Sequence, residues 1–423
     1  MLADTFTSEL ARELAPDALE RFLRYVQIDT ESEENPASYP STEKQLDLSR
    51  LLASELEAIG AEEVEIDRYG YLTATIPATT DRDVPTIGFI AHVDTVPGVP
   101  GAGVKPQVVR YDGGRLALPG DPAQALDPAE IPVLNEHVGH DLVTSDGTTL
   151  LGADDKAGVA EIMAAASYLL GHPEIEHGRV RVAFTPDEEI GEGTTHFDIE
   201  GFGAAAAYTL DGSEVGEIED ETFNAVRLTI TFIGRSTHTG TAKGKLVNAI
   251  KLAADFVASF PRDGLSPETT EEREGFVHPM TISGTTSTCR VAVILRDHDD
   301  AKIAEHEELV RRLADEAAAA DPRASVEIER KEEYRNMKHY LADHPRVLET
   351  AWEAARRVGV EPRGEIIRGG TDGARLSERG LPTPNLYTGG HSYHSLREWA
   401  CVQDMGTAAA TIVRLAEVWG EEP

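Results

Sequence analysis

Acidic residues and one histidine directly follow three short apolar segments that are typical of buried strands. His92 and Asp94 follow the first segment, Glu188 and Glu189 the second, and Asp211 the third. The carboxyl ends of parallel strands meet at one crevice of an open α/β sheet, where ligands bind. Imidazole and carboxylate groups are ligands that zinc accepts. The pattern therefore predicts a metal site at this edge of a sheet. The three segments are Thr86–Ala91, Arg179–Phe184 and Ala205–Leu210.

Two further motifs add ligands to this set. Asp154 stands before an Ala-rich helix predicted over residues 155–170, and His391 and His394 lie near the C-terminus. Two metal ions about 3.5 to 4 Å apart need a bridging carboxylate and further ligands on each side. The attacking water also needs a base beside it, and the adjacent Glu188 and Glu189 can divide the duties of base and ligand. The residues are sufficient in number for a two-metal centre.

Each of these residues also has a purely structural interpretation. His92 alone is as well explained by a backbone partner, Asp154 by a helix cap, and Asp211 by a turn before Gly212. Glu188 and Glu189 could form a solvated acidic run in so acidic a chain. The order of all the motifs together favours the metal site.

The elements around these motifs alternate between strands and helices. Thr42 and Gln45 match a capping box at the start of a helix that ends at Gly60. Further strands are expected at 64–66 and 71–76, and later helices at 345–357 and 407–419. Residues 96–149 are expected to form a long loop or a small hairpin insertion. This alternation predicts a mainly parallel sheet.

The middle of the chain follows a different order of elements. Strands and helices from about residue 225 to residue 329 follow the order βαββαβ, which is a ferredoxin-like unit. The fold class expected is thus α/β, with a mainly parallel-sheet catalytic domain interrupted by a ferredoxin-like lid. The expected boundaries are 1–222 and 335–423 for the two parts of the catalytic domain and 223–334 for the lid.

The composition of the chain limits the kinds of binding partner and the cellular compartment that are expected. The chain has 423 residues with 75 acidic and 39 basic side chains, so its formal charge of −36 would repel nucleic acid and anionic membranes. Its two cysteines, Cys289 and Cys401, are far apart, which is typical of a reduced cytosol. Residues 1–10 lack the basic start and apolar stretch of a secretory signal. A cytoplasmic protein is expected.

Taken together, the motifs resemble those of the aminoacylase-like dizinc metallopeptidases. The matching residues are His92-x-Asp94, Gly152-x-Asp154-Asp155-Lys156-x-Gly158, Glu188-Glu189, Asp211 and Tyr393-His394-Ser395. The longer stretches 150–163, 237–248 and 368–390 resemble the tripeptide aminopeptidases of that family. The resemblance covers nearly the whole chain, including the inserted unit, which in this family is a lid and often a dimerisation domain. It therefore leaves open a homodimer formed through the lid.

The resemblance implies a role for each residue of the site. One zinc ion would be held by His92, Asp154 and Asp211, and the other by Asp154, Glu189 and His394, so that Asp154 bridges them. Other divalent metals stay possible. The catalytic residues would be Asp94, which holds the His92 ring from behind, and Glu188, the general base for a hydroxide that bridges the zinc ions. The Asp154-Asp155 bond tends to be cis in this family.

Three further residues are implied to bind substrate. His238 matches a lid histidine that stabilises a developing oxyanion, although Thr239 stands where the family usually has proline. Arg368 matches an arginine that holds the substrate carboxylate, a group that suits the guanidinium fork. Arg296 is a weaker candidate for the same carboxylate, and pairing with Asp297 or a neighbour is its structural alternative.

The function expected is hydrolysis of the N-terminal peptide bond of short peptides, tripeptides first. A dipeptidase, a deacylase or a carboxypeptidase would share every metal ligand. A homologue that binds metal without catalysis is an alternative of another class, because a fold alone does not guarantee function. A two-metal phosphatase is a remote alternative, since no basic or Gly-rich phosphate cradle accompanies the motifs.

Overall fold

The computed structural model describes residues 5–421, which form two compact units. The larger unit extends to Asp220 and includes Tyr340–Glu365 and the chain from Thr371 onward. The inserted unit contains Glu221–His339 and Ile366–Gly370. Residues 1–4 and 422–423, at the two ends of the expected catalytic domain, lie outside the described residues. Residues 1–4 are also part of the segment 1–10, for which no secretory signal was expected.

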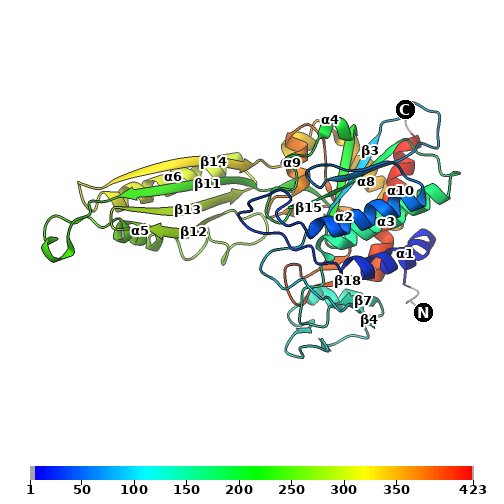
Figure 1. Cartoon of the computed structure of the whole chain (residues 1–423), viewed down its shortest axis with the longest axis horizontal. Helices are drawn as coiled ribbons and strands as arrows, with labels where there is room; N and C mark the ends of the chain where they lie inside the picture. Colours follow the sequence, from blue (N-terminus) through cyan, green and yellow to red (C-terminus); the bar gives the residue numbers. More distant parts are fainter. Residues whose placement is uncertain (1–4, 422–423) are drawn as a thin grey trace. The chain divides into compact units, whose positions relative to one another are not determined.

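An eight-stranded mixed sheet forms the centre of the larger unit (Figure 1). Its strand order is β1-β2-β8-β3-β9-β16-β10-β15. The four neighbours β8, β3, β9 and β16 are parallel, whereas β1, β2 and β10 are antiparallel to their neighbours. The parallel core expected from the sequence is confirmed, and antiparallel strands extend it. The bounds are β1 Glu62–Ile66, β2 Leu72–Ile76, β3 Ile87–His92, β8 Val180–Thr185, β9 Ala206–Gly212, β10 Glu217–Thr222, β15 Arg363–Ile367 and β16 Asn385–Tyr387.

Helices cover both faces of this sheet. Alternate residues of its central strands point to opposite faces, and both sets are buried, so each face needs a layer of helices against it. Phe89 of β3 joins the large core with α1, α3, α8 and α10, and Figure 1 shows α1, α3 and α10 packed together. Ile90, the next residue, joins a separate cluster with Phe202 of α4 and Leu376 of α9. The result is a three-layer arrangement. The bounds are α1 Glu9–Tyr25, α3 Ala153–Gly171, α4 Ile199–Phe202, α8 Pro345–Arg357, α9 Asp372–Glu378 and α10 Val402–Glu421, with the single-turn α7 at Lys338–Leu341.

Helix α2 (Gln45–Ile59) begins differently from the sequence prediction. Its N-cap is Lys44, which makes no side-chain cap hydrogen bond, so the predicted capping box is wrong. The Gln45 amide donates to Thr42 Oγ1 over 3.2 Å, but it also donates to Asp187 Oδ1 over 2.7 Å. A long-range contact therefore uses the side chain that the local pattern assigned to the cap. The helix ends at Gly60 in the left-handed region, as predicted.

A second, four-stranded sheet replaces the loop or hairpin expected over residues 96–149. Its order is β17-β18-β7-β4, all antiparallel, so that strands from this segment pair with strands from near the C-terminus. The expectation was therefore incomplete. The bounds are β4 Gln107–Arg110, β7 Asp141–Thr144, β17 Gly390–His391 and β18 Trp399–Cys401, with the short pair β5 Leu116–Ala117 and β6 Ala125–Leu126 and the 3-10 helix η1 Pro132–His137 between β4 and β7.

The inserted unit has the expected ferredoxin-like order of elements. Its sheet has the order β12-β13-β11-β14, and α5 and α6 pack on it. Its apolar core is separate from that of the larger unit. The predicted fold class is confirmed. The bounds are β11 Asn224–Ile233, η2 Thr239–Thr241, α5 Ala249–Ala258, β12 Phe276–Gly284, β13 Thr288–Asp297, α6 Asp300–Ala318 and β14 Ser325–Tyr334. Within residues 5–421, no helix is long and apolar enough to cross a membrane.

Candidate metal centre

The parallel strands bring the predicted strand-end ligands together. His92 is the last residue of β3, and Asp211 lies near the end of the adjacent parallel strand β9. His92 Nε2 lies 2.8 Å from Asp154 Oδ1 and 3.7 Å from Asp211 Oδ1. One imidazole nitrogen thus faces two carboxylates, as a shared cation would require.

Asp154 lies between two imidazole rings. Its second oxygen, Oδ2, is 3.0 Å from His394 Nε2, and this nitrogen is 2.9 Å from Glu189 Oε2. Donor atoms of His92, Asp154 and Glu189 all lie within 4.8 Å of one another. The two oxygens of Asp154 thus face different imidazoles, His92 and His394, as those of a bridging ligand would. A second group of donor atoms within 4.8 Å of one another contains His92, Asp155 and Asp211.

The structure also bears on the alternatives for these residues. Asp154 does not cap α3, because the N-cap is Gly152 and Asp154 itself has non-helical dihedral angles. The Asp154-Asp155 bond is cis, as the resemblance implied. The Glu189 side chain is only 5% exposed and does not belong to a solvated run. His391 stacks on Trp399 with ring centroids 4.1 Å apart, so the geometry favours His394 as the last ligand.

The turn that carries Glu188 and Glu189 is held by buried hydrogen bonds that local sequence patterns do not reveal. Asp187 has a φ of 62°, and its carboxylate accepts from the Ser41 N–H over 2.7 Å and from the Gln45 amide. Gln45 Oε1 in turn accepts from the Asp187 N–H over 3.1 Å. Helix α2 thereby fixes the direction in which the two glutamates leave β8.

Asp94 contacts this turn more than it contacts His92. Its two carboxylate oxygens accept from the N–H groups of Glu188, over 3.0 Å, and Glu189, over 3.2 Å. The His92 ring nitrogen Nδ1 is 3.1 Å from the Asp94 backbone oxygen and 3.4 Å from its Oδ1. Asp94 therefore orients the backbone of Glu188 and Glu189 together, and holds the His92 ring chiefly through its own backbone.

Glu398 holds the loop that presents Asp154. Its buried carboxylate accepts from the N–H groups of Leu151, Gly152 and Asp154 over 2.9, 2.7 and 3.0 Å. Glu398 lies three residues after Ser395 of the last motif, and no role was predicted for it from the sequence. Three backbone donors on one carboxylate fix the path of the chain up to Asp154.

The electrostatics of the cluster show an excess of buried negative charge. Burial and the charge of Asp154 raise the pKa of Glu189 to about 7 and that of Asp211 to about 6. The hydrogen bonds to Asp154 and Glu189 raise the pKa of His394 to about 10. The pKa of His92 is raised well above its usual value, because its hydrogen bonds to Asp154 and Asp211 outweigh burial. A bound divalent cation would offset the negative charge that raises these pKa values.

Glu188 is distinct from the ligands. Burial, followed by the charge of Asp372, raises its pKa well above the ordinary range. Glu188 lines a cavity of about 10 Å³ together with His92, Asp211 and Asp372, close to the volume of one water-sized sphere. Asp372 was not among the site residues predicted from the sequence. It lies in the stretch 368–390, in which only Arg368 was expected to bind substrate.

The residues present fit a pair of divalent cations. Three carboxylates and two imidazoles supply oxygen and nitrogen donors, and two divalent cations would offset the −3 charge of the three carboxylates. Two buried carboxylate atoms, Glu189 Oε1 and Asp155 Oδ1, have no hydrogen-bond partner among the described residues. Buried oxygens are costly unless something satisfies them.

The three residues predicted to bind substrate belong to the inserted unit. His238 is exposed, and its Nδ1 accepts from the Gly240 N–H over 3.1 Å. Arg296 pairs with Glu333 over 2.9 Å rather than with Asp297. Arg368 donates to the backbone oxygens of three residues within its own unit, Thr270, Glu272 and Glu274. Their role toward substrate stays a prediction.

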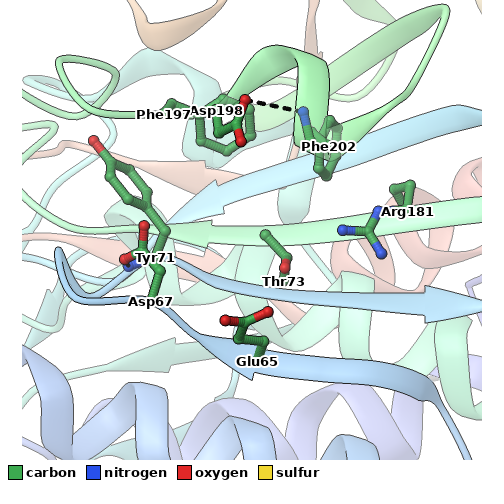
Figure 2. A pocket seen from close by; sticks show the side chains of 9 residues that line it. Glu65, Asp67, Tyr71, Thr73, Arg181, Phe197, Asp198 and Phe202 are labelled. Carbon is green, nitrogen blue, oxygen red and sulfur yellow. Dashed lines mark hydrogen bonds between the residues drawn. The ribbon is translucent and has the colours of Figure 1, made fainter.

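A larger cavity of about 220 Å³ lies over other strands of the same unit (Figure 2). Arg181, Thr73 and Glu65 project into it from β8, β2 and β1, and Phe197 and Phe202 form its other wall. Arg181 is already paired with Thr75 and Glu63. None of the predicted site residues is among its described lining residues, so this cavity is separate from the metal centre.

Comparison with known proteins assigns the family. Residues 141–418 match the model of peptidase family M20/M25/M40. The chain is 46% identical over 402 residues to peptidase T of Shouchella clausii, which covers 95% of this chain and 98% of the relative. The crystal structure of aminopeptidase PepT from Bacillus cereus is similar with a TM-score of 0.73 at 26% identity, covering 96% of this chain and 98% of that one.

A more distant structure shares the fold. The YXEP protein of Bacillus subtilis, described as a dinuclear metal binding peptidase, aligns with a TM-score of 0.65 at 17% identity over 97% of this chain and 99% of that one. The resemblance that the motifs indicated, including its tripeptide aminopeptidase branch, is confirmed by the relatives. The chain belongs to peptidase family M20/M25/M40.

Proposed function

We propose that the chain is a two-metal aminopeptidase that removes the N-terminal residue from short peptides, with tripeptides preferred. One observation carries this proposal: the Asp154 carboxylate lies between His92 and His394, with Glu188 beside the cluster but outside it. The relatives named peptidase T and aminopeptidase support the substrate class.

In this proposal the metals are two zinc ions, although another divalent ion would fit the same donors. One would be held by His92, Asp154 and Asp211, and the other by Asp154, Glu189 and His394. When bound, such a pair supplies an acidified water and polarises the peptide carbonyl. Asp154 is the one residue shared by both.

Glu188 performs the proton transfers. It accepts the proton of the attacking water and delivers it to the leaving amine, so one carboxylate serves as base and then as acid. Its raised pKa suits a group that must hold this proton between the two steps. Asp94 supports the transfers by fixing the Glu188 N–H, and hence the start of its side chain.

Substrate contacts are proposed for the inserted unit. The exposed imidazole of His238 is available to donate to a developing oxyanion. Arg368 and Arg296 are proposed to bind the substrate carboxylate, although each already has partners in its own unit. Substrate would have to replace part of these contacts. We also propose a cytoplasmic location and a homodimer formed through this unit.

A panel of four substrates tests the substrate class. We expect rapid hydrolysis of Ala-Ala-Ala, slower hydrolysis of Ala-Ala, and little or none of N-acetyl-Ala-Ala-Ala or N-acetyl-Ala. Rapid cleavage of the blocked peptides without cleavage of the free tripeptide would contradict an aminopeptidase and favour the deacylase or carboxypeptidase alternatives. Absence of hydrolysis throughout the panel, with metal bound, would favour the non-catalytic homologue.

A further inference from the structure

A second cluster of metal-ligating side chains lies in the larger unit, outside the centre described above. It contains His137, His140, Cys401 and Asp404, and one donor atom of each lies within 4.8 Å of those of the others. The ligands form two pairs in the sequence, His-x-x-His and Cys-x-x-Asp. We propose that these four residues bind one structural zinc ion, independently of the catalytic pair.

The distances suit a tetrahedral site. Zn–S and Zn–N bonds of about 2.3 and 2.05 Å place sulfur and nitrogen ligands about 3.6 Å apart, and Cys401 Sγ lies 3.5 Å from His140 Nδ1. His137 Nε2 lies 2.8 Å from Asp404 Oδ2. That contact would have to widen by roughly half an ångström on binding, since nitrogen and oxygen ligands of one zinc ion are about 3.3 Å apart.

The surroundings already orient two of the ligands. His137 Nδ1 lies 3.0 Å from the backbone oxygen of Val133, to which it donates, and this leaves Nε2 as the ligand atom. Cys401 directly precedes α10, where the helix terminus favours a thiolate. The backbone N–H groups of Gln403 and Asp404 point to this sulfur and act to lower the thiol pKa, although burial raises it overall.

Charge balance favours a divalent ion over the arrangement without metal. A thiolate, a carboxylate and two neutral imidazoles sum to −2, which one Zn²⁺ neutralises in a largely buried position. Without metal, Cys401 Sγ lies 3.7 Å from Gln403 Oε1 and 3.5 Å from His140 Nδ1, in addition to the two backbone N–H groups that point to it. Metal binding would release the Cys401 thiol proton and any proton on His137 Nε2 to solvent, so affinity should fall in acid.

Four protein ligands and no open position are typical of a structural zinc site rather than a catalytic one. His137 ends η1 and His140 directly precedes β7, while Cys401 ends β18. The ion would therefore fasten the two chain segments whose strands pair in the small sheet. The loop between β17 and β18 carries His394, so the second site would support the position of a ligand of the first.

Cobalt spectroscopy separates this site from the catalytic pair, because the catalytic ligands include no sulfur. In the full-length protein loaded with Co²⁺, we expect a thiolate-to-cobalt charge-transfer absorption in the near ultraviolet. Cys401→Ser should abolish this absorption. Cys289→Ser is the matched control, since Cys289 is the only other cysteine and lies in the core of the inserted unit; it should leave the absorption unchanged.

Metal content provides the second measurement. We expect three zinc ions per native chain and two per chain of Cys401→Ser or His140→Gln. His140 is a less buried ligand than Cys401, so His140→Gln tests the site even if Cys401→Ser misfolds. Cobalt bound to the chain without any thiolate absorption, or equal zinc content in native and His140→Gln protein, would overturn the proposal. Neither result would depend on peptidase activity.

Discussion

At the residue scale, the single side chain of Asp154 contacts both halves of the candidate metal centre. Its two oxygens face different imidazoles, His92 and His394, so its removal would disturb both of the proposed metal positions together. Glu188 and Glu189 show the opposite situation, because adjacent residues of one turn have different surroundings. Glu189 contacts His394. Glu188 instead lines the small cavity beside His92.

The division between Glu188 and Glu189 can be tested directly. Glu188→Gln should lower kcat on a tripeptide by about 10²- to 10⁴-fold, the range for loss of a general base, and leave metal content unchanged. Glu192→Gln, an exposed acid of the same loop, should change neither quantity. Steady-state kinetics and metal analysis check both variants. If Glu188→Gln retained full turnover, Glu188 would not be the base.

Most of the candidate site could be predicted from sequence, because the carboxyl ends of parallel strands meet at one edge of the sheet and bring the residues that follow them together. The contacts that orient the ligands could not be predicted. Gln45 meets Asp187 across 142 residues, and Glu398 meets the Asp154 loop across 244 residues. No local pattern encodes such pairs, and the capping-box pattern at Gln45 indicated a different partner.

At the scale of elements, the loop before α3 depends on Glu398. In Glu398→Gln, the side chain would present an NH₂ group to one of three backbone donors, so the loop should lose a hydrogen bond and its fixed position. We expect metal affinity to fall about 10- to 100-fold, as for other residues that support metal ligands, with kcat recovered at saturating metal. Metal titration followed by activity checks this.

Glu130→Gln is the matched control for that change. Glu130 is exposed and pairs with Arg397, the residue beside Glu398, so its loss should change metal affinity by less than twofold because exposed ion pairs contribute little. An unchanged metal affinity in Glu398→Gln would show that the loop holds its position without this carboxylate.

The prediction missed helix α1, although Leu10, Leu14 and Phe22 lie on its buried face. Pro16 inside the helix removes a backbone donor and weakens any local helix signal. The helix is stabilised instead by packing on α3 and α10 and by a link to α2. The small sheet was missed for a related reason, since strands of two to four residues from distant parts of the chain leave no periodic pattern.

The link between α1 and α2 gives a pH-dependent prediction. Glu55 accepts from Arg21 over 2.7 Å and from Tyr25 and Arg24, and these contacts outweigh burial and lower its pKa. A lowered pKa stabilises the fold fully above the unfolded value of about 4.3 and loses this contribution as the pH falls through the folded value. Glu55→Gln should therefore lower the free energy of unfolding by about 1 to 3 kcal/mol at pH 7.

The same variant should be nearly as stable as the native protein once the pH lies below the folded pKa of Glu55, because the carboxyl is then protonated in both states. Urea unfolding at several pH values checks this, with Glu57→Gln, an exposed acid of the same helix, as control. A difference between Glu55→Gln and native protein that does not vary with pH would contradict the role of the charge.

At the scale of the whole molecule, two separate cores imply two units that can respond separately. All the proposed metal ligands lie in the larger unit, so chelation should lower the unfolding transition of that unit and leave the other in place. Loss of a ligand present at 1,000 times its Kd removes about 4 kcal/mol. Differential scanning calorimetry with and without chelator measures this.

A core substitution assigns the second transition. Phe256→Ala removes a fully buried ring from the inserted unit, which should cost about 3 to 5 kcal/mol and leave the chelator-sensitive transition unchanged. Both transitions moving together after either treatment would show that the two units unfold as one.

The products of one tripeptide test the central proposal most directly. A tripeptide of three different residues, incubated with the metal-loaded protein and analysed by mass spectrometry, should yield the free N-terminal residue and the dipeptide of the other two, and should stay intact when the metal is chelated. An N-terminal dipeptide with a free C-terminal residue would identify a carboxypeptidase, and cleavage that persists without metal would contradict the metal centre itself.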